Sequence, residues 1–136
     1  MNTNYVLDAF ALMAYLRDEP GGVRVSELLK SAIAGSVELY MSIVNFGEIV
    51  YVSEQAGGQA AAETAILTLD SLPIEVVPAD RPLTLAAAHL KAHHRMSYAD
   101  TFAAALALAM DAVLVTGDPE FKALEDTVQI EWIAQR

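Results

Sequence analysis

Four acidic residues occupy positions from which a fold could gather them around one divalent metal ion. They are Asp8, Glu48, Asp100 and Asp118. A cluster of carboxylate oxygens is the ligand set that magnesium and manganese prefer, and both ions bind phosphate oxygens well. Such a centre can polarise a phosphoryl group and lower the pKa of a bound water, which is the chemistry of phosphodiester hydrolysis. The four acids therefore predict a Mg²⁺ or Mn²⁺ centre, whereas zinc would require histidine or cysteine ligands.

Three of these acids also have a purely structural interpretation as residues at helix starts. Asp8 and Asp118 each follow a short apolar run and precede an expected helix, where an aspartate commonly accepts a backbone N–H. Asp100 lies three residues after Ser97, in the pattern of a capping box whose acid faces the helix dipole. Capping explains each of the three when it is taken singly. One shared site explains all three together with Glu48.

Glu48 is the acid that capping does not explain. Its expected helix, residues 43–54, is apolar on nearly every side, and the residues four positions before and after it are Val44 and Val52. No cation on the same helix can therefore offset its charge. A buried, unpaired carboxylate is costly or takes up a proton, so a partner such as a metal ion is expected. A solvated helix face is the alternative.

Basic residues that could bind a polyanionic substrate are few. Lys91 and Arg95 lead into the Asp100 segment, and we predict that they bind the substrate through its phosphate backbone. Arg17 and Arg24 are further candidates for such a contact.

His89 and His93 are four residues apart, a spacing that also suits a metal ion. A zinc protease motif would need a third ligand and a general-base glutamate, and this segment has neither. We therefore interpret the two histidines as cations near a helix C-terminus, where the helix dipole favours them.

The composition is that of a globular protein, with 54% hydrophobic and 19% charged residues, and one domain over residues 1–136 is expected. The absence of cysteine excludes disulfides and thiolate metal sites. No signal peptide is visible, and the longest apolar run, residues 102–110, is too short to span a membrane. A cytoplasmic protein without a membrane partner is expected.

The formal net charge of −10 opposes nucleic-acid binding by bulk electrostatics, so a polyanion must meet a local basic patch or a bound cation.

The elements that must position the acids alternate between strands and helices. Strands are expected at residues 4–7, 37–41, 74–77, 112–116 and 128–133. Helices are expected at residues 9–18, 23–35, 43–54, 60–72, 82–94 and 97–110, with a short one from residue 119. This alternation predicts an α/β sandwich around a mostly parallel sheet, whose functional site lies at the carboxyl ends of the strands.

The order and spacing of four segments resemble the PIN domain family, and more narrowly the VapC toxins of toxin–antitoxin modules. The resemblance covers essentially the whole chain. The matching segments are Val6 to Leu16, Asn45 to Glu48, Ser97 to Ala107 and Val115 to Phe121.

The resemblance implies a three-layer α/β/α sandwich and a magnesium- or manganese-dependent endoribonuclease that cuts RNA. It also implies a homodimer that a small cognate antitoxin silences. The family's metal-site acids correspond to the four acids named above, and Asn45 and Thr116 match positions that often support the site. Many members have a small hydroxyl residue two positions after the first aspartate. Phe10 stands there instead, so no hydroxyl contact with substrate or water is expected from that position.

Two other classes of protein fit the sequence less well. A catalytically silent PIN-like scaffold that only binds partners would have lost one or more of the acids, and all four are present. A phosphoacceptor domain of receiver type usually has an acidic pair after its first strand, whereas Asp8 stands alone between Leu7 and Ala9. The nuclease interpretation would fail if the fold separated the acids, or if an arginine or lysine filled the space between them.

Overall fold

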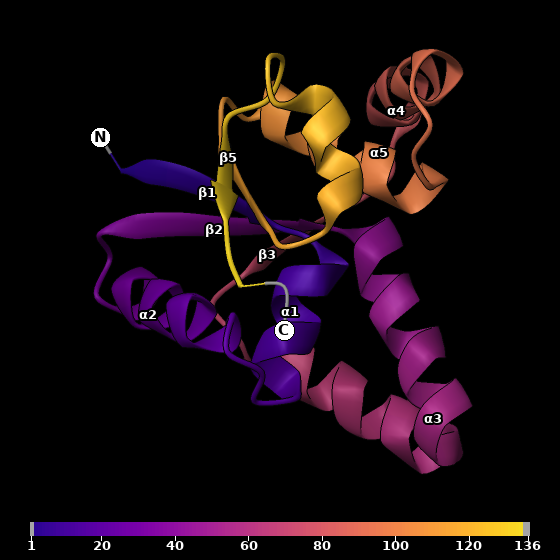
Figure 1. Cartoon of the computed structure of the whole chain (residues 1–136). Helices are drawn as coiled ribbons and strands as arrows, with labels where there is room; N and C mark the ends of the chain where they lie inside the picture. The colour runs from indigo at the N-terminus through magenta and orange to yellow at the C-terminus, as the bar shows by residue number, and fades with distance from the viewer. Residues whose placement is uncertain (1, 135–136) are drawn as a thin grey trace.

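A computed structural model describes residues 2–134 of the chain and contains a five-stranded sheet of order β3-β2-β1-β4-β5. Every pairing between neighbouring strands of this sheet is parallel. The strands are β1 (Thr3–Leu7), β2 (Val37–Ser42), β3 (Glu75–Val77), β4 (Val113–Thr116) and β5 (Ile130–Trp132). The expected parallel sheet is confirmed, and β1 lies in its middle (Figure 1).

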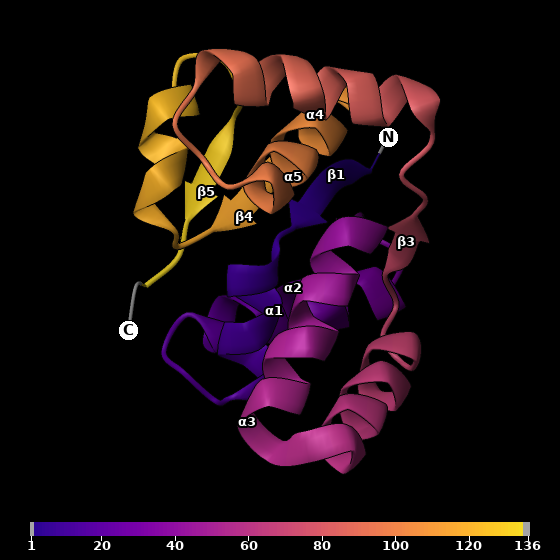
Figure 2. The same ribbon diagram turned by 90° about the vertical axis from the view of Figure 1, so that its right-hand side faces the viewer.

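Helices connect the strands and cover the sheet. They are α1 (Ala9–Leu16), α2 (Gly22–Ile33), α3 (Ile43–Asp70), α4 (Arg81–His93), α5 (Tyr98–Ala109) and the 3-10 helix η1 (Pro119–Leu124). Figure 2 shows α4, α5 and η1 on one side of the sheet and α1, α2 and α3 on the other. The expected three-layer α/β/α sandwich is therefore confirmed.

Alternating side chains of the central strands build two separate cores. Val6 of β1 and Leu114 of β4 pack with α4, α5 and η1, while their neighbours Leu7 and Val115 pack with α1, α2 and α3. This follows from the strand geometry, in which successive side chains point to opposite faces. All four side chains are fully buried, as a central parallel strand requires.

The strand order places a topological switch beside β1. From β1 the chain adds β2 and β3 on one side, and it then returns across the sheet to add β4 and β5 on the other. The carboxyl ends of β1 and β4 therefore lie side by side. Asp8 directly follows β1, and Thr116 is the last residue of β4. Ligands of open α/β sheets commonly bind at such a switch.

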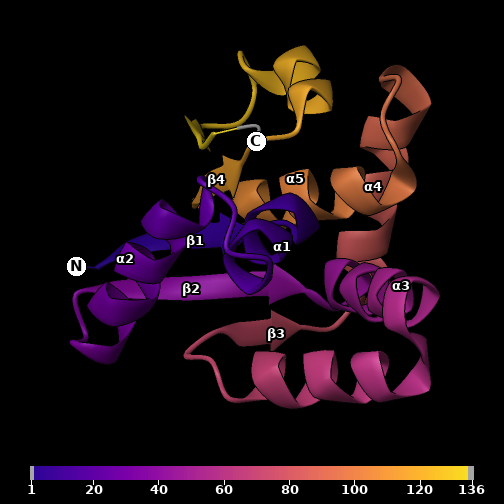
Figure 3. The same ribbon diagram turned by 60° about the horizontal axis from the view of Figure 1, so that its bottom comes forward.

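Helix α3 combines the two helices expected at residues 43–54 and 60–72, and it bends sharply at Gly58. The segment expected to separate the two helices is itself helical apart from Gly58. Gly58 has φ 80° and ψ −176°, a conformation that a residue with a Cβ rarely adopts. Figure 3 shows the first piece leaving β2 and the second running back along the sheet to β3. The first piece carries Asn45 and Glu48 to the carboxyl edge of the sheet.

The remaining elements agree with the sequence-based expectations apart from their ends. The last strand covers Ile130–Trp132 and not the whole of residues 128–133, and the short helix after Asp118 is a 3-10 helix. No helix in the described part of the chain has the length and apolar character needed to cross a membrane.

Candidate metal centre

Asp8 is buried at the carboxyl end of β1 and is held by hydrogen bonds on both of its oxygens. Its Oδ1 accepts the backbone N–H of Ala11 at 2.8 Å, which caps α1. Its Oδ2 accepts the hydroxyl of Thr116 at 2.5 Å, and the Thr116 oxygen in turn accepts the backbone N–H of Asp118 at 3.0 Å. Thr116 thus links the ends of β1 and β4. Each carboxylate oxygen keeps a free lone pair that a metal ion can use.

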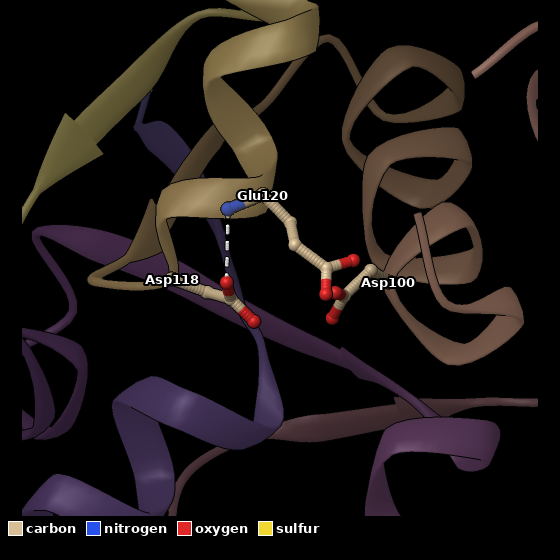
Figure 4. A group of neighbouring side chains, drawn as sticks. All are labelled: Asp100, Asp118 and Glu120. Atoms are coloured by element: carbon tan, nitrogen blue, oxygen red, sulfur yellow. Dashed lines mark hydrogen bonds between the residues drawn. The ribbon is translucent and has the colours of Figure 1, made fainter. Parts of the chain in front are cut away.

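Asp100 and Asp118 lie close to a third acid, Glu120, which no pattern in the sequence indicated as a site residue. One carboxylate oxygen of each lies within 4.8 Å of the others. Figure 4 shows the three side chains next to one another. Asp118 Oδ1 accepts the backbone N–H of Glu120 at 2.9 Å, and Glu120 Oε1 accepts that of Ser97 at 3.0 Å. The second bond ties η1 to the start of α5, so Glu120 helps to hold Asp100 and Asp118 together.

Glu48 faces the same pocket from α3, and its oxygen atom Oε1 is buried without a hydrogen-bond partner. Asn45, one helical turn earlier, donates its side-chain N–H to the carbonyl of Ala99 at 3.1 Å and so fastens α3 to the start of α5. The Asn45 oxygen Oδ1 is also buried without a partner. Two orphaned buried oxygens beside three further carboxylates are what a cation or its bound water would satisfy.

The acids share one pocket of about 180 Å³ at the carboxyl edge of the sheet. Glu48, Asp100 and Asp118 line it directly, together with Phe10 and Arg17 of the α1 segment. Asp8 lies behind this lining, buried to 1% exposure, and interacts electrostatically with the other three acids. The predicted residues from β1, α3, α5 and the end of β4 therefore converge on one place.

Burial and mutual repulsion disfavour ionisation of these acids. Burial raises the pKa of Asp8 to about 7, and the charges of Asp118 and Glu48 add to the rise. Burial raises the pKa of Asp100 to about 8, with further increases from Asp118 and Asp8. The pKa of Glu48 is raised by burial and by Asp118, while the nearby Asn45 amide opposes this. A divalent cation bound between these carboxyl groups would offset their mutual repulsion and allow all of them to ionise.

The donor set fits a hard divalent ion. It consists of carboxylate oxygens with an amide oxygen nearby, and it offers neither thiolate nor imidazole. Within residues 2–134, Arg17 is the basic residue that lines the pocket, and it forms no ion pair with the acids. The ion pairs of the described residues join Arg24 of α2 to Glu27 and to Glu131 of β5. Neither condition that would have ended the nuclease interpretation is met.

The capping interpretation is correct for Asp8 and Asp118, and it coexists with the site. For Asp100 it is only half correct: the Ser97 hydroxyl accepts the Asp100 backbone N–H at 3.1 Å, but the Ser97 N–H bonds to Glu120 and not back to Asp100. Asp8, Ser97 and Asp118 cap α1, α5 and η1 through side-chain acceptors. These caps fix the positions of Asp8, Asp118 and the start of α5 at the carboxyl edge of the sheet. The positive ends of the helix dipoles therefore face the acids. The local role therefore supplies the orientation that the site needs.

The predicted substrate contacts of Lys91 and Arg95 stay predictions. Lys91 donates from Nζ to the carbonyl of Met96 at 2.6 Å and so stabilises the loop between α4 and α5. Arg95 is exposed in that loop, outside the lining of the acid pocket. The rings of His89 and His93 lie 4.7 Å apart at the C-terminal end of α4, which agrees with their interpretation as helix-end residues.

Phe10 packs against the turn that carries Asp118. A Cβ added at Gly117 would overlap the Phe10 ring, with Cζ at 2.8 Å and Cδ1 at 3.0 Å. The aromatic ring thus occupies the room that a side chain at position 117 would need, and it forms an apolar wall of the pocket.

Replacing Gly117 with alanine is expected to lower the free energy of unfolding by about 1–3 kcal/mol, because the new methyl group overfills the space against Phe10. Urea unfolding measures the change. Gly47→Ala is the matched control, since a Cβ there meets no atom within 4 Å and should be neutral or stabilising. Combining Gly117→Ala with Phe10→Ala should recover part of the loss. Equal stability of Gly117→Ala and the parent would contradict this packing.

Comparison with protein families identifies the PIN domain over residues 5–126. No curated protein sequence gives a significant match. The fold is similar to that of VapBC2 from Rickettsia felis bound to a promoter DNA fragment, with a TM-score of 0.74, 18% identity, and coverage of 96% of this chain and 99% of that one. DNA-bound VapBC from Salmonella typhimurium is also similar, with a TM-score of 0.73 and 17% identity. The alignment covers 96% of this chain and 98% of that one.

A third similar structure is VapC20 from Mycobacterium tuberculosis, described as a sarcin-ricin loop cleaving toxin. Its TM-score is 0.65 at 16% identity, and the alignment covers 88% of this chain and 93% of that one. At such low identities the structural likeness establishes the fold. The residues that converge on the pocket must carry the argument about chemistry.

Proposed function

The chain belongs to the PIN domain family, and on that premise we propose that it is a metal-dependent endoribonuclease and the toxin of a VapBC-type toxin–antitoxin pair. The observation that supports this most strongly is the convergence of Asp8, Glu48, Asp100 and Asp118 on one pocket. Buried acids that repel one another are destabilising, so a fold that collects them needs a compensating function. We take residues 1–136 as a single nuclease domain.

Asp8, Asp100 and Asp118 would hold a magnesium or manganese ion, directly or through waters, and Glu48 would complete the set. When bound, the ion polarises a phosphoryl oxygen and lowers the pKa of a water. Within the chain, Thr116 orients Asp8 through its hydroxyl, and Asn45 holds the Glu48 segment of α3 against α5. Glu48 would orient the attacking water from its unpartnered oxygen. The products would be a 5′-phosphate and a 3′-hydroxyl.

The partners follow from the same family relationship. Similar structures include toxin–antitoxin complexes, such as the VapBC proteins from R. felis and S. typhimurium. We propose that this chain likewise binds a cognate antitoxin, forms a homodimer and acts on RNA in the cytoplasm. The net charge of −10 suits a basic segment of the antitoxin.

Purified protein incubated with protein-free total RNA tests this function. Cleavage is expected with Mn²⁺ or Mg²⁺ and is expected to stop when EDTA removes the metal. Induction of the chain in a bacterial host should arrest growth, and co-expression of its cognate antitoxin should relieve the arrest. Intact RNA with every divalent ion tried would contradict the proposal and would favour a silent scaffold.

A further inference from the structure

The acid pocket poses an electrostatic problem for an RNA substrate. The chain carries 18 acidic and 8 basic residues, and four or more acids surround the site. A single divalent ion offsets only part of that charge, so the phosphates next to the cleavage site need a cation supplied by the protein. In the described part of the chain, Arg17 is the basic residue that lines the pocket.

Helix α1 places Arg17 opposite the metal acids. Phe10, Met13 and Arg17 follow one another at spacings of three and four residues, so they share one face of the α1 segment, and all three line the pocket. Arg17 is the C-cap of α1, with its backbone N–H bonded to the Met13 carbonyl at 2.9 Å. Side chains lean toward the N-terminus of their helix, which directs Arg17 back toward the end that Asp8 caps.

The guanidinium of Arg17 is available to a ligand. The residue is exposed, and its side chain forms no hydrogen bond or ion pair with any residue between 2 and 134. Two other candidate cations are already engaged: Arg24 binds Glu131 through two nitrogens, at 2.6 and 3.3 Å, and Lys91 binds the Met96 carbonyl. Arg17 also borders a second, wider groove of about 540 Å³ between α1 and α3, so it stands at the rim and not between the acids.

We propose that Arg17 binds a backbone phosphate of the RNA next to the scissile bond. This inference rests on the proposed ribonuclease function and assigns the anion-binding residue of its site. An arginine fork can donate two parallel hydrogen bonds to phosphate oxygens, and it keeps its charge at every physiological pH. Arg17 is a substrate-binding residue in this account and takes no part in holding the metal.

Steady-state cleavage of a short RNA that spans a mapped cut site tests the assignment. Arg17→Ala is expected to raise KM roughly 10- to 100-fold with a smaller change in kcat, and Arg17→Lys should recover part of the loss. The slope of log KM against log salt concentration should shrink by about 0.7 for the lost phosphate contact. The affinity for Mn²⁺, measured without RNA, should stay within about twofold of the parent, since Arg17 is not a ligand.

Arg81→Ala is the matched control. It removes the same charge from an exposed arginine at the first residue of α4, outside the acid pocket, and should leave KM and the salt slope unchanged. A KM for Arg17→Ala within twofold of the parent, or an equal effect of Arg81→Ala, would overturn the assignment while leaving the nuclease intact. A parent protein that cuts no RNA would instead overturn the proposed function, and this inference with it.

Discussion

Replacing Asp100 with asparagine is expected to reduce RNA cleavage by on the order of 10³-fold or more without unfolding the protein. Asparagine keeps the shape of the side chain but removes the charge that the metal ion requires. The same change removes repulsion, because Asp100 is buried and its pKa is raised by burial and by Asp118 and Asp8. The metal-free variant should therefore be more stable than the parent at pH 8.

Cleavage rates and thermal unfolding, measured on the same preparations, check both halves of this prediction. Asp126→Asn is the control, since Asp126 is an exposed residue outside the pocket. Loss of activity with a lower Tm would indicate a structural role for Asp100. Cleavage at the parent rate would remove Asp100 from the active site.

Saturating Mn²⁺ is expected to raise the Tm of the parent, and to raise it more at pH 8 than at pH 5. At a free Mn²⁺ concentration of about 100 times the Kd, binding adds about 2.7 kcal/mol to the free energy of unfolding. For a domain of this size that raises the Tm by roughly 9 °C. The pH dependence follows from the pKa of Asp8, about 7, and of Asp100, about 8, against an ordinary value of 3.8. The folded protein keeps protons that the unfolded chain releases near pH 4, so metal-free stability falls as the pH rises from about 4 to about 8.

Thermal unfolding at pH 5 and pH 8, with Mn²⁺ and with EDTA, measures these shifts. At pH 5 protons compete with the ion for Asp8 and Asp100, so the shift should be small. At pH 8 the ion should offset the repulsion between the carboxylates. A Tm that does not respond to Mn²⁺ at pH 8, or that responds more at pH 5, would contradict the shared metal site.

Much of this site is predictable because its residues stand at points where local sequence sets the direction of the chain. Asp8 and Asp118 follow buried strands, and parallel strands present their carboxyl ends at one edge. Glu48 stands out because a charged residue in an apolar helix needs a partner. The adjacent Gly57 and Gly58 also predict an interruption of the helical pattern, which the structure makes as a bend within α3 and not as a break between two helices.

The parts that the sequence did not predict depend on contacts between distant segments. Glu120 resembles an ordinary acid in a first helical turn, and only the fold brings it to Ser97 and Asp100. Arg17 and Arg24 were both candidate phosphate-binding residues in the sequence. Only the fold shows that Arg24 is paired with Glu131, 107 residues away, while Arg17 is not. The packing of Phe10 on Gly117 likewise joins residues that no local pattern connects.

The most direct test of the shared metal site is the binding of Mn²⁺ to the parent and to single variants, followed through the electron paramagnetic resonance signal of the free ion. We expect saturable binding by the parent and at least about tenfold weaker binding by each of Asp8→Asn, Glu48→Gln, Asp100→Asn and Asp118→Asn. Glu63→Gln, an exposed acid on α3, should bind as the parent does. Unchanged affinity in the four pocket variants, or an equal loss in Glu63→Gln, would show that these carboxylates do not share a metal ion.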